Sequence, residues 1–370
     1  MSTQVEIARK LGISQKTVSR VICGSRHVCP RTRKRVLAAI ERSGYSLNLS
    51  ARNLHNGRKG VVGITYLGYP PMHSSFFLPT FRGICREAES NHLAVLASSL
   101  EGPADNAAIA SLASKTDGLI VFNLCERVQD GERVAKRLER LGSPVMTVQN
   151  FPSRRSLPRV AINNRLGGYR AGRHLLELKH TGIAFFGYRP DNAECRERLE
   201  GCLQACDEAG HPMRKEWVFY CPAEDLDAAV DSFFSLPKAG RPTAIFAWGD
   251  WNARVIVSLC ERRGVRVPED ISVIGFDDFA PYSLTMHPYL TTIRQPLEEM
   301  GQEAMRRLVD LIEGKTVDSE LLLEPVLVKR ETCAPPAASR KAGKHGIAAR
   351  QPGAGRRTAG NGRAQTVCRL

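Results

Sequence analysis

The chain has 370 residues, of which 42% are hydrophobic and 25% charged, and its formal net charge is +15. The length exceeds one ordinary domain core, and the composition is that of a soluble globular protein. Because the sequence has neither an apolar run of roughly 18 residues nor a signal-peptide pattern at its start, we expect a cytoplasmic protein with no membrane partner.

The positive charge is concentrated at the two ends of the chain. Residues 1–60 carry 13 Lys and Arg against 2 Glu, a charge of +11, and residues 338–370 carry 8 Lys and Arg with no acid, a charge of +8. The remainder is mildly acidic, at −4. A basic head on an acidic body is typical of a nucleic-acid binder whose larger part has another role.

The N-terminal segment has the pattern of a helix-turn-helix. Residues 5–11 place apolar side chains at helical spacing, Gly12 suits a left-handed turn, and Ser14 can cap a second helix that runs to about Cys23. The second helix turns Val18, Val21 and Ile22 inward, so its outer face carries donors and acceptors that suit base edges in the major groove. The outer residues are Gln15, Lys16, Ser19 and Arg20.

A third helix is predicted from Pro30, which suits a first turn, to Ile40, and Gly44 ends it. Basic side chains are frequent at its start. An isolated run of this kind is most often a solvated surface, but beside a helix-turn-helix in a unit charged +11, contact with phosphate is favoured. The residues concerned are Arg31, Arg33, Lys34 and Arg35.

Several short motifs follow one another in this head. They are Val5-Glu-Ile-Ala, Gly12-Ile-Ser, Thr17-Val-Ser-Arg-Val21, Val28-x-Pro-x-Thr-Arg33 and Gly44-Tyr45. The set resembles the DNA-binding head of the LacI/GalR family of repressors almost position by position. The resemblance implies that the second helix enters the major groove, and it assigns base reading to Gln15, Lys16 and Arg20.

The segment after the head departs from this family at one place. The family has a proline and an asparagine where this chain has Leu47 and Asn48, so a hinge helix keeps its N-cap but starts less rigidly. The resemblance implies that this short helix folds on DNA in a dimer, with Leu54 wedged into a minor-groove base step and Ala51 beside it. The alternative is a plain linker in which Leu54 packs on the core.

From Val61 onward, β-rich apolar runs alternate with helix-like stretches, and the pattern restarts after about residue 163. Such alternation predicts two doubly wound lobes of parallel strands, whose carboxyl ends should meet across a cleft. The expected strands are residues 61–66, 93–99, 117–122, 144–149, 183–187, 217–221, 243–250 and 271–278.

The resemblance to the LacI/GalR family extends over roughly residues 5–333. Its most specific core signatures are Val267-Pro-Glu-Asp-Ile-Ser-Val-Ile-Gly-Phe-Asp-Asp278 and Leu290-Thr-Thr-Ile-Arg-Gln-Pro296. The family shares its core with periplasmic sugar-binding proteins. The resemblance therefore implies a homodimer that binds palindromic operator DNA and takes a small carbohydrate effector between its lobes.

Two charged residues are predicted to hold the effector. Asp277 directly follows a buried strand, which puts a carboxylate where sugar hydroxyls can donate to it, and by resemblance it is an effector ligand. The adjacent Asp278 better suits a loop or a helix cap. Arg198 matches the effector-binding arginine of the family, and its guanidinium can hold two ligand oxygens at once. Arg196 is the rival for that role.

Four further residues complete the predicted effector site. Where the family commonly has Ala-Asn-Asp, this chain keeps Asp250 but replaces the asparagine by Gly249, which removes one amide from the pocket. Tryptophans beside them can stack on a sugar face, although a buried tryptophan more often belongs to the core. By position, Gln149 stands where many members carry a ligand aspartate. The tryptophans are Trp248 and Trp251, and Phe76 or Phe77 is expected to line the other lobe.

These observations predict an all-α helix-turn-helix head joined to an α/β two-lobed, periplasmic-binding-protein-like core of doubly wound parallel sheets. Residues 336–370 have almost no large apolar side chains and should be a disordered basic tail. The absence of leucine heptads argues against a tetramer-forming coiled coil. The other expected units are a DNA-binding domain at 1–46, a hinge helix and linker at 47–59, and an effector-binding and dimerisation core at 60–335.

The predicted function is allosteric repression of transcription under the control of a sugar-like effector. An activator or dual regulator that responds to a non-sugar molecule is the alternative, because the position of the operator decides whether DNA binding represses or activates transcription. The DNA-binding head argues against a transporter's solute-binding protein, and common catalytic motifs are absent, so no enzyme is expected. Eleven cysteines without Cys-x-x-Cys spacing predict reduced thiols, and we expect no cofactor or metal, with Cys202 and Cys206 packed in the core.

Overall fold

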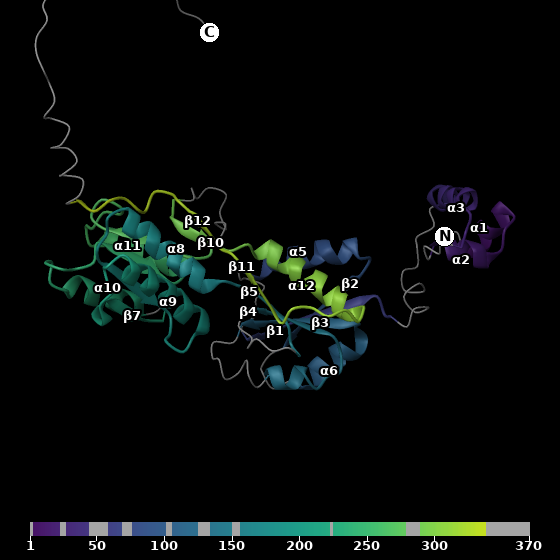
Figure 1. The fold of residues 1–370 in the computed structure, drawn as a ribbon, viewed down its shortest axis with the longest axis horizontal. Coiled ribbons are helices and arrows are strands. Elements are labelled where there is room, and N and C mark those ends of the chain that lie inside the picture. The colour runs from purple at the N-terminus through teal and green to yellow at the C-terminus, as the bar shows by residue number, and fades with distance from the viewer. Residues whose placement is uncertain are drawn as a thin grey trace, which may run out of the picture.

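A computed structural model of the chain describes residues 3–22, 27–43, 58–68, 76–100, 106–124, 134–149, 156–222, 225–278 and 289–337. They form a three-helix head and a core of two α/β lobes, which confirms the predicted fold class (Figure 1). The predicted hinge residues Ala51 and Leu54, and the basic tail from residue 338, lie outside the described residues.

The head is built from three short helices around one small core. Thr3 and Glu6 form a capping box at the start of the first helix, and Gly12, at φ 66°, ends it in the left-handed conformation. The helices are α1 (Gln4–Leu11), α2 (Gln15–Ile22) and α3 (Pro30–Ser43). Their buried side chains are Ile7, Ala8, Val18, Val21 and Val36.

The first lobe is a six-stranded parallel sheet in the order β11-β5-β4-β3-β1-β2. Its central strands are mostly apolar because helices cover both faces of the sheet, α5 and α12 on one side and α6 on the other (Figure 1). The strands are β1 (Val61–Gly68), β2 (Ala94–Leu100), β3 (Gly118–Leu124), β4 (Val145–Gln149), β5 (Arg159–Ile162) and β11 (Glu320–Leu323). The helices are α5 (Phe77–Ser90), α6 (Asn106–Lys115) and α12 (Leu297–Ile312).

The second lobe is a four-stranded parallel sheet in the order β7-β6-β8-β9, with a separate antiparallel pair, β10 and β12. One face of the sheet packs on α8 and α9 and the other on α10 and α11. The strands are β6 (Ile183–Gly187), β7 (Val218–Tyr220), β8 (Ala244–Ala247), β9 (Ser272–Ile274), β10 (Thr292–Arg294) and β12 (Val326–Val328). The helices are α8 (Asn164–Glu177), α9 (Ala193–Glu208), α10 (Leu226–Ser235), α11 (Asp250–Arg262) and the short 3-10 helix η2 (Lys215–Trp217).

The chain passes between the lobes three times: from β5 to α8, from β10 to α12 and from β11 to β12. These connections lie side by side, because β5 pairs with β11 and β10 pairs with β12. The amide of Asn163 also donates to the carbonyl of Leu323, which links two of the connections directly.

Two pairs of helices cross backbone to backbone at glycines. A Cβ added to Gly168 of α8 would overlap the carbonyl of Arg198, and one added to Gly201 of α9 would overlap the carbonyl of Arg165. Gly83 and Gly301 make the equivalent crossing between α5 and α12. Each lobe therefore contains one helix pair with no side chain between the two backbones at the crossing.

Candidate functional site

The outer side of α2 is the candidate DNA-binding face of the head. Burial of Val18 and Val21 against the neighbouring helices turns the opposite face outward. Gln15, Lys16 and Arg20 are all exposed on it, the first two in the first turn of the helix. These side chains carry donors and acceptors that can reach base edges in the major groove.

The basic start of α3 divides into two parts. Arg31 and Lys34 are exposed and are available to phosphate. Arg35 instead donates to the carbonyl of Leu11, at a distance of 3.2 Å, and so holds the end of α1 against α3. Arg35 therefore has a structural role inside the head, which competes with the phosphate contact expected for it.

The second lobe contains a buried arginine. Arg198 lies on α9 with its side chain 2% exposed, and it is the largest fully buried side chain among the described residues. Its Nε donates to Oδ1 of Asn164 at 2.9 Å, and one Nη donates to the carbonyl of Trp248. The guanidinium stacks over the ring of Phe276, 3.7 Å from the ring centroid. Aromatic stacking and hydrogen bonds thus offset the cost of burying this charge.

Two carboxylates lie near this guanidinium at longer distances. Asp277 is 3.4 Å from one Nη of Arg198, and Glu194 is 3.9 Å from the other. Asp277 also accepts a hydrogen bond of 2.6 Å from Nε2 of Gln295, and its own backbone has φ 118°. Burial raises the pKa of Asp277, the charges of Asp250 and Glu194 add to the rise, and Arg198 opposes it.

Asp250 and Gly249 occupy the first turn of α11, so the strand expected over 243–250 ends at Ala247. The Asp250 carboxylate is buried, accepts from Thr292 and lies against Gly275, which fixes α11 to the end of β9. A Cβ on Gly249 would lie 3.2 Å from Oδ2 of Asp277. The position where the family commonly has asparagine therefore faces the Asp277 carboxylate, and glycine places no side chain against it.

An aromatic pair stands beside Arg198. The ring of Trp248 stacks on Tyr188, with centroids 5.4 Å apart and planes at 21°, and both rings are half-buried. The indole NH of Trp248 donates to Oδ1 of Asn252 at 3.0 Å. Trp251 is 65% exposed, so the second aromatic side chain of the pair is Tyr188 rather than Trp251.

The two residues expected from the first lobe have different surroundings. Gln149 ends β4 with φ 70°, is buried, and its Oε1 accepts no hydrogen bond from the described residues. Phe77 is 5% exposed and packs on the rings of Tyr66, Phe81 and Phe122. Phe77 is therefore a core residue of the first lobe, whereas Gln149 keeps an open buried acceptor.

The structure thus brings Arg198, Trp248 and Asp277 together, places Asp250 one layer behind them, and puts Gln149 and Phe77 on the other lobe. Sequence reasoning missed three polar or aromatic neighbours. Each of them stands one or two residues after a strand, which is the signal that could have found them. They are Asn164, Tyr188 and Gln295.

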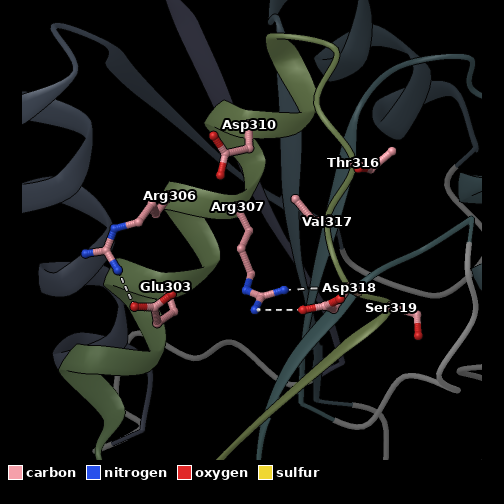
Figure 2. A pocket seen from close by; sticks show the side chains of 8 residues that line it. All are labelled: Glu303, Arg306, Arg307, Asp310, Thr316, Val317, Asp318 and Ser319. Atoms are coloured by element: carbon pink, nitrogen blue, oxygen red, sulfur yellow. Dashed lines mark hydrogen bonds and ion pairs between the residues drawn. The ribbon is translucent and has the colours of Figure 1, made fainter.

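A surface hollow of about 650 Å³ lies elsewhere, where the end of α12 meets the connection to β11 (Figure 2). Its charged side chains pair with one another: Arg306 contacts Glu303, and Arg307 donates to the carbonyl of Asp318 at 3.4 Å. None of the predicted effector residues lines it. In the described part of the chain, no cluster of three metal-ligating side chains occurs, and no helix is long and apolar enough to span a membrane.

A helix-turn-helix head on a two-lobed core with a buried polar cluster defines a DNA-binding regulator that senses a small molecule. Residues 3–48 match the bacterial regulatory proteins of the lacI family, and residues 173–333 match the periplasmic binding protein-like domain. The chain belongs to the lacI family of transcriptional regulators.

Relatives and solved structures agree with this assignment. The transcriptional repressor PurR of Aliivibrio fischeri (strain MJ11) is 30% identical over 339 residues, 90% of this chain and 98% of the relative. The CelR–cellobiose complex has a TM-score of 0.64 at 28% identity, over 90% of this chain and 100% of that one. The lac repressor dimer bound to operator and the anti-inducer ONPF has a TM-score of 0.66 at 25% identity, over 90% and 99%. The protein is a transcriptional repressor with a small-molecule effector, and its relatives are regulators rather than enzymes.

Proposed function

We propose that the protein acts as a homodimer on a palindromic operator, and that the operator affinity is set by a small sugar or sugar acid held beside Arg198. In this proposal Gln15, Lys16 and Arg20 read bases, and Leu54 and Ala51 enter the minor groove. The buried Arg198 guanidinium, with the Asp277 carboxylate 3.4 Å away, is the observation that carries the effector half of the proposal.

The Arg198–Asp277 pair suits vicinal hydroxyls. A buried Arg–Asp contact at this distance adds less stability than a close bidentate pair, so we assign the two side chains to holding a ligand rather than to stability. One ligand hydroxyl can donate to the Asp277 carboxylate, while a second oxygen accepts from the arginine. The stacked Tyr188 and Trp248 supply an aromatic wall against which the C–H groups of a sugar ring can pack. Gln149 would reach the ligand from the first lobe, and Asp250 and Phe77 would support the site from behind.

A planar nitrogen heterocycle is the second ligand class, and a specific observation favours it. Gln149 and Gln295 each have a buried Oε1 that accepts no hydrogen bond from the described residues. Two open amide acceptors suit N–H donors at the edge of a flat ring, and such a ring can also stack on an aromatic side chain.

Two observations support the homodimer. The chain resembles the lac repressor dimer over nearly its whole length. Leu78 of α5 is 53% exposed and Leu96 of β2 is 39% exposed, on two elements of the first lobe that contact each other. A second copy of the chain would cover these apolar side chains, and a two-fold dimer would match a palindromic site.

The effector site is tested by a thermal-shift screen of the purified protein against sugars, sugar acids and planar heterocycles. A compound at 100 times its Kd should stabilise the protein by about 2.7 kcal/mol. We expect the active compound to shift the wild type and Arg196→Ala but not Arg198→Ala. Arg196 is the matched control, because it lies two positions away on α9 with its side chain 52% exposed.

Calorimetry with the same compound separates loss of binding from loss of folding. Arg198→Lys keeps a positive charge but not the fork of donors, so it should fold and bind the compound at least tenfold more weakly. Wild-type affinity in both Arg198 variants would show that the effector lies elsewhere. If the effector acts as a corepressor, the Arg198 variants should fail to bind operator even when it is present.

A further inference from the structure

The chain enters the first lobe through residues 58–61, and one carboxylate holds this segment. Asp117 stands between α6 and β3, and its side chain accepts hydrogen bonds from three successive backbone amides. The distances are 2.7 Å from the amide of Lys59, 2.6 Å from that of Gly60 and 3.3 Å from that of Val61. The amide of Asp117 donates in return to the carbonyl of Val61 at 2.7 Å.

The backbone conformation at Gly60 makes this convergence possible. Gly60 is buried and has φ 73°, a left-handed conformation that favours glycine. Successive amides turned in this way form a small concave site for an anion, and here the anion is a side chain of the protein itself. A charged acceptor with three amide donors is a strong and directional anchor.

Two basic side chains of the same segment donate to carbonyls at helix ends. Lys59 donates from Nζ to the carbonyl of Thr116 at 2.7 Å and to that of Ala113 at 3.4 Å, both at the end of α6. Arg58 donates to the carbonyl of Ile312 at 3.4 Å, at the end of α12. Carbonyls at helix ends lack partners within the helix and carry the negative end of its dipole, so they attract cations.

We propose that Asp117 is a positioning residue for operator binding, because it fixes the place and direction in which the linker from the DNA-binding head leaves the core. The segment 58–61 together with Asp117 and the two helix ends is called the linker clamp. A released linker would have to be ordered again each time the head binds its operator, which lowers specific affinity. The clamp acts without touching DNA. The inference is independent of the proposed effector, because it depends only on the binding of the head to its operator.

The test compares Asp117→Asn with the wild type in the full-length protein. The asparagine keeps the shape but loses the charge and one acceptor oxygen. Binding is measured to a duplex selected from a random pool by the wild type, and to a random-sequence duplex of the same length. Asp207→Asn is the matched control. Asp207 is exposed on α9 in the other lobe, and its replacement removes the same charge.

We expect Asp117→Asn to bind the selected duplex about tenfold more weakly and the random duplex as the wild type does, at a temperature where both proteins are folded. Asp207→Asn should match the wild type on both. Hydrogen exchange should show faster exchange at the amides of residues 59–61 in Asp117→Asn alone. Wild-type affinity for the selected duplex, despite this faster exchange, would overturn the proposal.

A second variant keeps the proposal testable if Asp117→Asn unfolds. Lys59→Met removes the bonds to the end of α6 and also removes a cation from the segment where the chain enters the core. If Lys59 belongs to the clamp, specific affinity falls while the salt dependence of binding stays unchanged. If Lys59 contacts phosphate instead, affinity falls on both duplexes and the slope of log K against log salt decreases by about one, which would overturn its assignment to the clamp.

Discussion

At the scale of single residues, Asp277 links the candidate site to pH. Burial raises the pKa of its carboxyl above 3.8, so the folded protein keeps this proton to a higher pH than the unfolded chain does. The resulting stabilisation is present below the ordinary aspartate range and is lost as the pH rises through the raised pKa.

We therefore expect the free energy of unfolding to fall as the pH rises above the ordinary aspartate range, and Asp277→Asn to remove this dependence. Urea unfolding at a series of pH values measures it. Asp278→Asn is the neighbouring control: it breaks ion pairs with Arg294 and Arg330 and should lower stability, but it leaves the Asp277 carboxyl in place. The same slope in Asp277→Asn and in the wild type would contradict the assignment.

The sequence predicts single site residues unevenly, and the reason is physical. Asp277 could be found because it follows a fully apolar strand, and the choice between Arg198 and Arg196 rested on resemblance alone. Only the three-dimensional structure separates the two arginines, since one helix position faces the core and the other faces solvent. Tyr188 and Gln295 were not predicted as site residues. Their partners, Trp248 and Asp277, are 60 and 18 positions away in the sequence, so no local pattern indicates these contacts.

At the scale of elements, the long strands and helices follow from apolar periodicity, whereas the short strands do not. The strands β10 and β12 have three residues each, too few to show an alternation of apolar and polar side chains. They pair with each other, and Arg294 of β10 also forms a bridge with Asp277. The predicted strand 243–250 ran too far, because the residues after Ala247 begin α11 and bury a carboxylate there. Phe77 was expected to line the effector site, and in the structure its side chain packs on neighbouring aromatic rings in the core of the first lobe.

The helix crossing at Gly168 gives a prediction at this scale. An alanine there would overlap the carbonyl of Arg198 and push α8 away from α9. We expect Gly168→Ala to lower the free energy of unfolding by about 1–3 kcal/mol, and to weaken effector binding because Arg198 itself moves.

Gly172→Ala, one turn further along α8, is the matched control. Its Cβ would lie 3.1 Å from that of Ala205, a contact between two small side chains that can adjust. Alanine also favours a helix by about 1 kcal/mol over glycine, which offsets the tighter contact. Denaturant unfolding of both variants should show a clear loss at 168 and little change at 172. Equal effects would show that the close crossing is not specific to Gly168.

At the scale of the whole molecule, the charge is divided between a head of +11 and a tail of +8 around an acidic middle. Deleting residues 338–370 should flatten the salt dependence of DNA affinity and leave the sequence preference unchanged, because the segment carries eight basic residues and no acidic one. Replacing its eight basic residues by glutamine keeps the length and should have the same effect. Fluorescence anisotropy over a salt series measures both variants, and a changed operator preference would show that the tail reads sequence.

The three connections between the lobes have a mechanical consequence. They lie side by side, joined through the β5–β11 and β10–β12 pairs, so they resist shear and twist but can bend together. The glycine crossings keep the main helices of each lobe locked to one another, so the lobes themselves cannot absorb the motion. Relative movement of the lobes is then reduced to a single degree of freedom, an opening angle about the line of the connections. We expect a molecule that binds between the lobes to act by changing that angle, which favours a switch between two positions over a graded response.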